Sequence, residues 1–263
     1  EKDLALHLNL ISASTNVIYY TASSDPYANA SSGAGGAWNS QLQSTLTSVI
    51  GEANYDIGHL FGASGGGGNA GCIGCVCTNN SKGSGFTSPA DGIPQGDNFD
   101  IDYVVHEVGH QLGANHTFSY SNEGYGVNKE VGSGITIMGY AGITTQDVAS
   151  HSIDIYHEAS IAQIQSNLGT KTCPVTTSIT NSTPVVNAVS NYTIPISTPF
   201  ALTGSATDAN SGDVLTYCWE QNDNASTSQT GNSSRASATK ASGPNWISFP
   251  ASTSPVRYFP RLS

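Results

Sequence analysis

The segment HEVGHQLGANH, residues 106–116, holds three of the seven histidines of the chain, together with one glutamate and two glycines. His106 and His110 are four positions apart, so on a helix both imidazoles project from one face, about one turn apart. Two ligands of a tetrahedral metal ion need this arrangement. Gly113 allows the backbone to leave the helix with a positive φ, and the turn brings His116 back as a third ligand.

Three histidine ligands leave one position open on a tetrahedral zinc ion. An open position is typical of a catalytic zinc site, because it holds the water that the metal acidifies. Glu107 adjoins the first ligand and can reach that water without binding the metal, which favours a role as general base. The alternative is that the histidines are ordinary core or surface residues, but five specified residues at fixed spacings make coincidence very improbable.

The chain repeats the His-Glu dipeptide once, at His157 and Glu158. Ile161 stands where a second metal ligand would be needed, so we predict a structural or solvated role for this pair. His7, His59 and His151 have no partners visible in the sequence and receive no role.

A helix should carry the histidine segment. Apolar residues recur with helical spacing through residues 99–114, Asp100 or Asp102 is the expected N-cap, and Gly113 should end the helix. Residues 157–168 predict another helix. Upstream, residues 4–12 and 16–21 predict strands, residues 38–50 a helix that ends at Gly51, and residues 55–63 a short strand. Between them, residues 62–85 form a Gly-rich loop of the kind that is functional or crosslinked.

The tail of the chain differs in character, and we place a domain boundary there: residues 1–175 form the first domain and residues 176–263 the second. The tail has short β-rich runs broken by turn residues, which predicts an all-β sandwich of immunoglobulin or fibronectin type after a linker near residues 174–184. Within it, Asp208, Asn210 and Asp213 have the spacing of a structural calcium loop, although an ordinary hairpin turn is the preferred interpretation.

The charge balance excludes some partners. Eight basic and 19 acidic residues give a net charge of −11, which argues against nucleic acid and against anionic lipid. The chain also lacks an apolar run long enough to cross a membrane.

Four cysteines, Cys72, Cys75, Cys77 and Cys173, lie in the first domain. Their even number in a Gly-rich setting indicates disulfides formed in an oxidising compartment, with three possible pairings. A thiolate zinc site is the alternative, but no second C-x-x-C pair completes it. Cys218 in the tail is predicted to be a buried core thiol.

The pattern H-E-x-x-H-x-x-G-x-x-H resembles the signature of the metzincin zinc peptidases, and Met138, the only methionine, resembles their methionine turn. Within that clan, residues 1–173 resemble the bacterial reprolysin-like (adamalysin-related) metallopeptidases, and the tail resembles Ig-like modules appended to such enzymes. The resemblance implies an α+β (α/β) catalytic domain with a twisted mixed sheet and an active-site helix. It further implies Zn²⁺ as cofactor and protein or peptide substrates. The whole is then a secreted or cell-surface endopeptidase, expected to be a monomer.

Two positions depart from the adamalysin pattern. Animal adamalysins usually carry Asp after the third histidine, where this chain has Thr117. Tyr140, two residues past the methionine, resembles instead the tyrosine of astacins and serralysins, which ligates zinc or stabilises the oxyanion; the alternative is a packing tyrosine.

The resemblance also suggests that an extended substrate adds to the edge strand expected at residues 55–63. Two other functions compete with the peptidase. One is a catalytically silent binding or adhesion module, against which the presence of Glu107 argues. The other is a metal-dependent hydrolase of non-peptide substrates.

Overall fold

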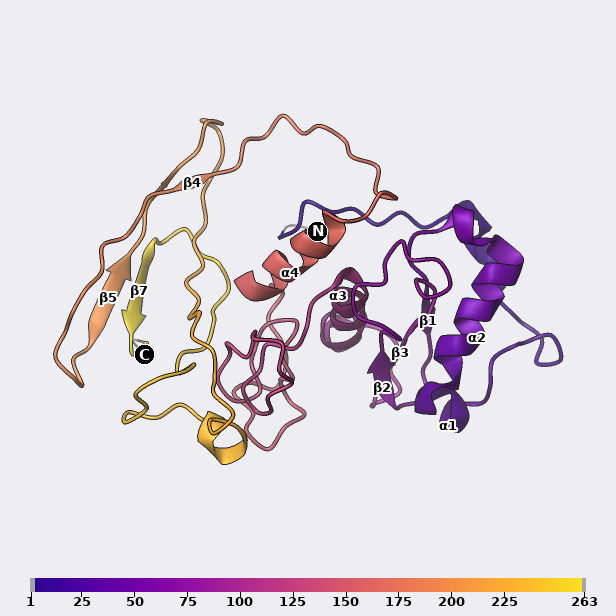
Figure 1. Ribbon diagram of the computed structural model, residues 1–263, viewed down its shortest axis with the longest axis horizontal. Helices are drawn as coiled ribbons and strands as arrows, with labels where there is room; N and C mark the ends of the chain where they lie inside the picture. Colours follow the sequence, from indigo (N-terminus) through magenta and orange to yellow (C-terminus); the bar gives the residue numbers. More distant parts are fainter. Residues whose placement is uncertain (1–2, 262–263) are drawn as a thin grey trace.

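The computed structural model describes residues 3–261, and the first part of the chain is organised around a small twisted mixed sheet (Figure 1). The strand order is β1-β3-β2, where β1 is His59–Phe61, β2 is Gly67–Asn69 and β3 is Gly85–Ser88. Strand β1 runs parallel to β3 with His59 opposite Gly85, whereas β2 runs antiparallel with Gly68 opposite Thr87. The predicted α+β class with a mixed sheet is confirmed for this part of the chain.

Helices lie on both sides of the sheet, with α2 and α3 flanking it (Figure 1). The α-helices are α1 (Ala30–Ser32), α2 (Trp38–Thr45), α3 (His106–Leu112) and α4 (Glu158–Leu168). Short 3-10 segments cover Ser12–Val17, Glu52–Asn54 and Gly231–Ser234, and π-helical segments cover Gly33–Ala37, Leu46–Ile50 and Asn98–Val105. The helices expected at residues 38–50 and 157–168 are therefore present.

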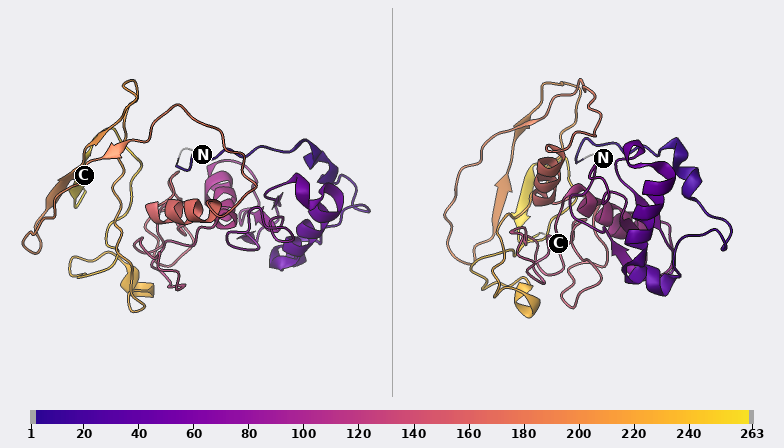
Figure 2. Two further views of the ribbon diagram at one scale, coloured as in Figure 1. Left: turned by 45° about the horizontal axis from the view of Figure 1, so that its top comes forward. Right: turned by 45° about the vertical axis from the view of Figure 1, so that its right-hand side comes forward.

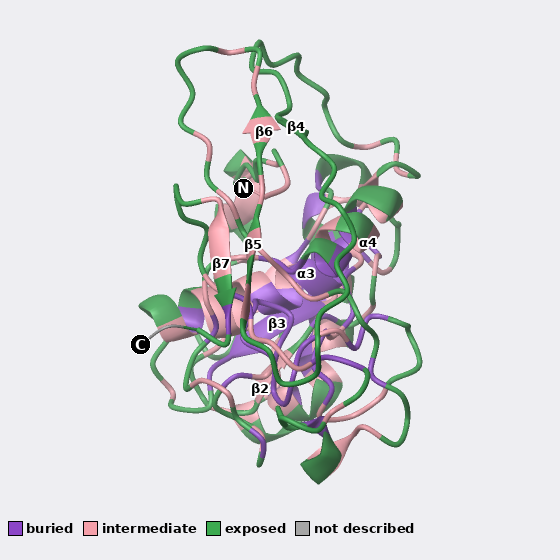
Figure 3. Ribbon diagram, turned by 90° about the vertical axis from the view of Figure 1, so that its left-hand side faces the viewer, coloured by how far each residue is buried: buried purple, intermediate pink, exposed green. Residues whose placement is uncertain are grey.

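The core consists of two apolar clusters, one on each side of the central strand. One gathers Leu112, Met138 and Ile164 between α3 and α4. The other gathers Leu42, Leu46 and related residues beneath α2. Figure 3 shows the buried residues concentrated in α3 and β3. All four residues of β3 are buried, and α3 packs against this strand.

Two local predictions were wrong. Residues 4–12 and 16–21 form no strand in the described structure, and Leu8 and Leu10 are exposed. The apolar residues of these segments pack against the outside of the two core clusters and do not pair with another strand. The helical run before α3 begins at Asn98, not at Asp100 or Asp102. Asp102 accepts from the Ser152 N–H, so it ties this run to a later loop.

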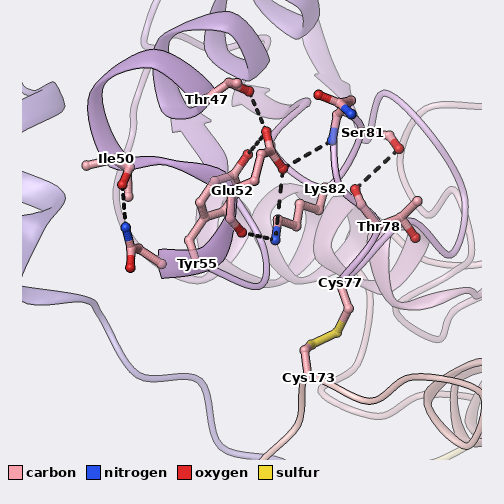
Figure 4. Close-up of polar contacts among 12 residues, drawn as sticks. Thr47, Ile50, Glu52, Tyr55, Cys77, Thr78, Ser81, Lys82 and Cys173 are labelled. Carbon is pink, nitrogen blue, oxygen red and sulfur yellow. Dashed lines mark hydrogen bonds and ion pairs between the residues drawn. A yellow bond between two sulfur atoms is a disulfide. The ribbon is translucent and has the colours of Figure 1, made fainter.

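The first four cysteines of the chain form two disulfides, Cys72–Cys75 and Cys77–Cys173. This pairing selects one of the three possibilities and replaces the thiolate alternative, because the sulfurs are bonded to each other. The second bridge lies near a polar cluster in which Lys82 and Tyr55 surround Glu52 (Figure 4). The prediction for Cys218 was wrong, because its residue is exposed and its thiol reaches only the Phe249 carbonyl.

The tail contributes two separate two-stranded ladders. Strand β4 (Val185–Val186) pairs with β6 (Ala206–Thr207), and β5 (Phe200–Thr203) pairs with β7 (Val256–Phe259), both antiparallel. Two separate two-stranded ladders do not make the two packed sheets that a sandwich requires. Residues 174–199 are exposed throughout. Among residues 3–261, no helix combines the length and apolar character needed to cross a membrane.

Residues 220–235 of the tail return to the first part of the chain, where they lie beside the loops that follow α3 (Figure 2). Glu220 accepts from the Glu158 N–H at the start of α4. The Ala225 N–H donates to the Asn128 carbonyl, and the Gly132 N–H donates to the Ser234 carbonyl. The segment thus joins α4 to the loop of residues 120–132.

Buried His157 has a structural role in this region. It is 1% exposed, its ring nitrogen accepts from the Ala159 N–H as the N-cap of α4, and its other ring nitrogen contacts the Gln221 carbonyl. The structural interpretation of the second His-Glu pair therefore holds for His157, whereas Glu158 is exposed to solvent.

Candidate active site

The three histidines of the sequence pattern converge at the end of α3. His106 and His110 occupy one face of that helix. The helix ends at Gly113, whose φ of 123° lies in the region that glycine adopts without strain, and its N–H donates to the carbonyls of Gly109 and His110. The chain then turns so that His116 faces the helix. A side chain with a Cβ at Gly113 would strain this turn.

The converging atoms are the three Nε2 nitrogens. Nε2 of His116 lies 3.2 Å from Nε2 of His106 and 3.0 Å from Nε2 of His110. In a tetrahedral zinc site with bonds of about 2.0–2.1 Å, ligand nitrogens are separated by roughly 3.3 Å. The spacing of these three imidazoles therefore fits a zinc ion.

The other ring nitrogen of each histidine has its own acceptor. Nδ1 of His106 lies 2.6 Å from the Ile137 carbonyl oxygen, and Nδ1 of His110 lies 2.7 Å from the Ala114 carbonyl oxygen. Nδ1 of His116 lies 2.9 Å from a carboxylate oxygen of Glu123. Each acceptor fixes the proton on Nδ1, which leaves Nε2 with a lone pair for a metal.

Electrostatics keep these imidazoles neutral. Burial, reinforced by the neighbouring imidazoles, lowers the pKa of His106 well below its ordinary value and that of His110 to about 4. Burial lowers the pKa of His116 to about 4 as well, so its contact with Glu123 is a hydrogen bond from a neutral ring. Neutral imidazole is the form that binds a metal ion.

Glu107 lies beside the three histidines without joining their cluster of ligand atoms. Its side chain is buried and hydrogen-bonds the Ala70 backbone, and burial raises its pKa to about 8. Strand β2 passes very close to it: a Cβ on Gly68 would lie 2.5 Å from Oε1 of Glu107. Glycine at this position lets the strand approach the carboxylate.

Comparison with known proteins assigns this arrangement to a family. The family model described as metallo-peptidase family M12B, reprolysin-like, matches residues 1–168, more than half of the chain. The chain belongs to the reprolysin-like M12B metallopeptidases. No curated protein and no solved structure matches it. With the His106–His110–His116 group, the family membership identifies the chain as a zinc metalloendopeptidase that acts on proteins or peptides.

Tyr140 stands at the edge of the reprolysin-like metal site. Its ring centroid lies 4.5 Å from that of His116 and 4.7 Å from that of Phe118. Burial, together with the nearby charge of Glu107, raises its pKa to about 12, so the phenol keeps its proton near neutral pH. Met138 is fully buried in the core cluster with Leu112, on the interior side of α3.

A cleft opens over His110 and His116. It has a volume of about 470 Å³, and its lining includes segments from both sides of the metal site. Its residues are Gly68, Asn69, Ala70, Gly71, Cys72, Ile73, Glu107, His110, His116, Glu123, Tyr125 and Tyr140.

The strand that borders this cleft is β2, not the strand of residues 55–63. That segment forms β1, which lies across β3 from the cleft. The expected strand is present and lies at an edge of the sheet, but at the edge away from the cleft. Strand β2 was missed because its Gly-rich sequence has no strand-like composition.

Sequence reasoning also missed two acidic residues around the site, Glu123 and Glu130. Glu123 follows His116 by seven residues in a loop of small polar residues and holds that ring. Glu130 lies farther along and is 3% exposed. No motif in the sequence marks either residue. Acidic residues are few near the histidine motif, but this scarcity does not indicate which histidine or turn an acidic side chain contacts.

Proposed function

We propose that this reprolysin-like enzyme is a secreted endopeptidase in which Glu107 is the general base. The observation that carries the proposal is the buried Glu107 carboxylate in the same cleft as His110 and His116, two of the three convergent histidines. His106, His110 and His116 would hold the zinc ion. When bound, zinc lowers the pKa of a water and polarises the scissile carbonyl. Glu107 takes the proton of the attacking water and later delivers it to the leaving amine.

Substrate chain would lie extended along β2. This strand is at the edge of the sheet, pairs with β3 on one side only and borders the cleft. An unpaired strand edge offers main-chain donors and acceptors to an extended peptide regardless of its side chains. Cleavage inside long chains, as opposed to trimming of their ends, follows from such binding.

Mapping the cuts made in a digested proteome tests this function. We expect many new internal termini with the wild-type enzyme, identified by mass spectrometry, and none above background with Glu107→Gln. Aligned cut sites would also read out the side-chain preference of the cleft. Absence of new termini with zinc-loaded wild-type enzyme would overturn the endopeptidase proposal.

Tyr140 is proposed to donate a hydrogen bond to the developing oxyanion. Its proton, retained because burial raises the pKa, and its place in the cleft beside His116 support this role. Tyr140→Phe should lower kcat by roughly tenfold to a thousandfold, the range for losing one such donor, with little change in KM or zinc content.

Tyr125→Phe is the matched control, because Tyr125 lines the same cleft but no ring contact joins it to the histidines in the described structure. An unchanged kcat in Tyr140→Phe would reduce Tyr140 to a packing residue. If the phenol ligates zinc in the resting enzyme instead, cobalt-substituted wild type should show an absorption band that the Phe variant lacks.

The remaining assignments stay predictions. Two disulfides favour an extracellular location, because reducing compartments keep thiols free. Residues 1–175 as the catalytic domain, a tail of immunoglobulin type and a monomeric state are likewise predictions. A calcium site gains no support, since Asp208 accepts from the Asn210 N–H and the Asp213 N–H donates to the Asn210 carbonyl, as in an ordinary turn.

A further inference from the structure

We propose that Glu130 is a positioning residue for the zinc site, fixing both the loop that carries His116 and the turn that contains Met138. The proposal rests on zinc binding by the three histidines and assigns a role to a residue outside the HExxHxxGxxH motif. Glu130 lies 14 residues after His116 and does not line the cleft.

The Glu130 carboxylate receives four hydrogen bonds in the interior of the protein. Oε1 accepts from the N–H groups of Ile135 and Thr136, at 2.9 and 3.0 Å. Oε2 accepts from the hydroxyls of Thr117 and Thr136, each at 2.5 Å. A buried carboxylate requires such compensation, and hydrogen bonds to a charged group are about twice as strong as neutral ones. The two segments are therefore held to one another through this group.

Each of the two segments is connected to a metal-site histidine, one along the chain and the other through a hydrogen bond. Thr117 is the residue after His116, and its N–H donates to the Met138 carbonyl. On the other side, the Ile137 carbonyl, one residue after Thr136, accepts from Nδ1 of His106. Glu130 thus sets the distance between the support of the first histidine and the backbone of the third.

The loop that carries Glu130 is also held from outside. The Asn128 carbonyl accepts from the Ala225 N–H, and Nζ of Lys129 donates to the Asn222 carbonyl at 3.1 Å. Backbone N–H groups of Lys129 and Glu130 donate to the Thr117 carbonyl. The loop is therefore bonded to the tail on one side and to Thr117 on the other. Together with the hydrogen bonds of the Glu130 carboxylate, these contacts fix its position.

Measurement of zinc affinity tests the proposal without reference to turnover. Glu130→Gln keeps the size of the side chain but replaces one acceptor oxygen with an NH₂ donor, which cannot accept from the surrounding hydroxyls and N–H groups. We expect zinc to bind about 10–100-fold more weakly, the cost typical of losing an outer partner of a metal ligand. Competition with a fluorescent zinc chelator measures this, and the cobalt-substituted spectrum should shift as well.

Glu52→Gln is the matched control. Glu52 also accepts from four donors, the side chains of Gln43, Thr47 and Tyr55 and the Asn80 N–H, but its cluster lies away from the histidines. Zinc affinity should stay within about twofold of wild type in this variant. Equal weakening by both substitutions would reflect general instability and would overturn the proposal.

A smaller change covers the case in which Glu130→Gln does not fold. Thr117→Val removes one hydroxyl bond to the carboxylate, whereas Thr117→Ser retains it. Val should weaken zinc binding severalfold and Ser should restore it. Wild-type affinity in folded Glu130→Gln or in Thr117→Val would overturn the positioning role. Failure of the peptidase assay in wild type would instead overturn the proposed function and leave the zinc measurement unaffected.

Discussion

Glu107→Gln should lower kcat by about 10²–10⁴-fold, the typical contribution of a positioned general base, while the zinc content stays that of wild type. The amide keeps the shape of the side chain beside β2 but cannot take a proton from the attacking water. Steady-state kinetics on a fluorogenic peptide and metal analysis of the same preparation measure the two quantities together.

His116→Ala provides the contrast for this experiment. Loss of one of three converging nitrogens should release the metal, and activity should fall because the zinc is gone. Equal loss of zinc from both variants would show that Glu107 acts as a ligand or as a structural residue and would contradict the roles proposed for them.

Removal of zinc should abolish proteolysis altogether. Purified enzyme should contain about one zinc per chain, phenanthroline should eliminate cleavage of the peptide, and added zinc should restore it, because binding of the metal to three neutral imidazoles is reversible. Metal analysis before and after dialysis, paired with the activity assay, measures the correlation.

Calcium is the matched control for that restoration. Calcium prefers oxygen ligands, whereas this group offers three ring nitrogens, so calcium added to the stripped enzyme should restore nothing. Full activity in an enzyme shown to be free of zinc would contradict the metallopeptidase mechanism.

Local patterns in the sequence were sufficient for the helix that bears the ligands. Helical spacing of His106 and His110 and a glycine at residue 113 each express geometry within a few residues, and the structure brings these histidines together as that geometry requires. The helix that ends at Gly51 was predictable for the same reason. The resemblance to the reprolysin-like family also implied a helix that bears the metal ligands.

Features that depend on distant partners could not be predicted in this way. Strand β2 consists of Gly67, Gly68 and Asn69, residues with little strand preference, and it exists because β3 offers an edge. Residues 4–12 have the alternation of a strand but no such edge beside them. The acceptors of the histidine Nδ1 atoms, including Glu123, come from loops whose path no periodicity describes.

The exposed run of residues 174–199 has a consequence for an enzyme that cuts extended chains. Every residue of this segment is exposed, so we expect another copy of the enzyme to cleave it during storage or at high concentration. The fragment beyond the cut would still be attached to the loop of residues 120–132 and to the start of α4 by its own hydrogen bonds. Self-digestion at this point would therefore yield a nicked enzyme in two associated pieces, with Glu130 and its loop still clamped, and not a shortened enzyme that has shed its tail.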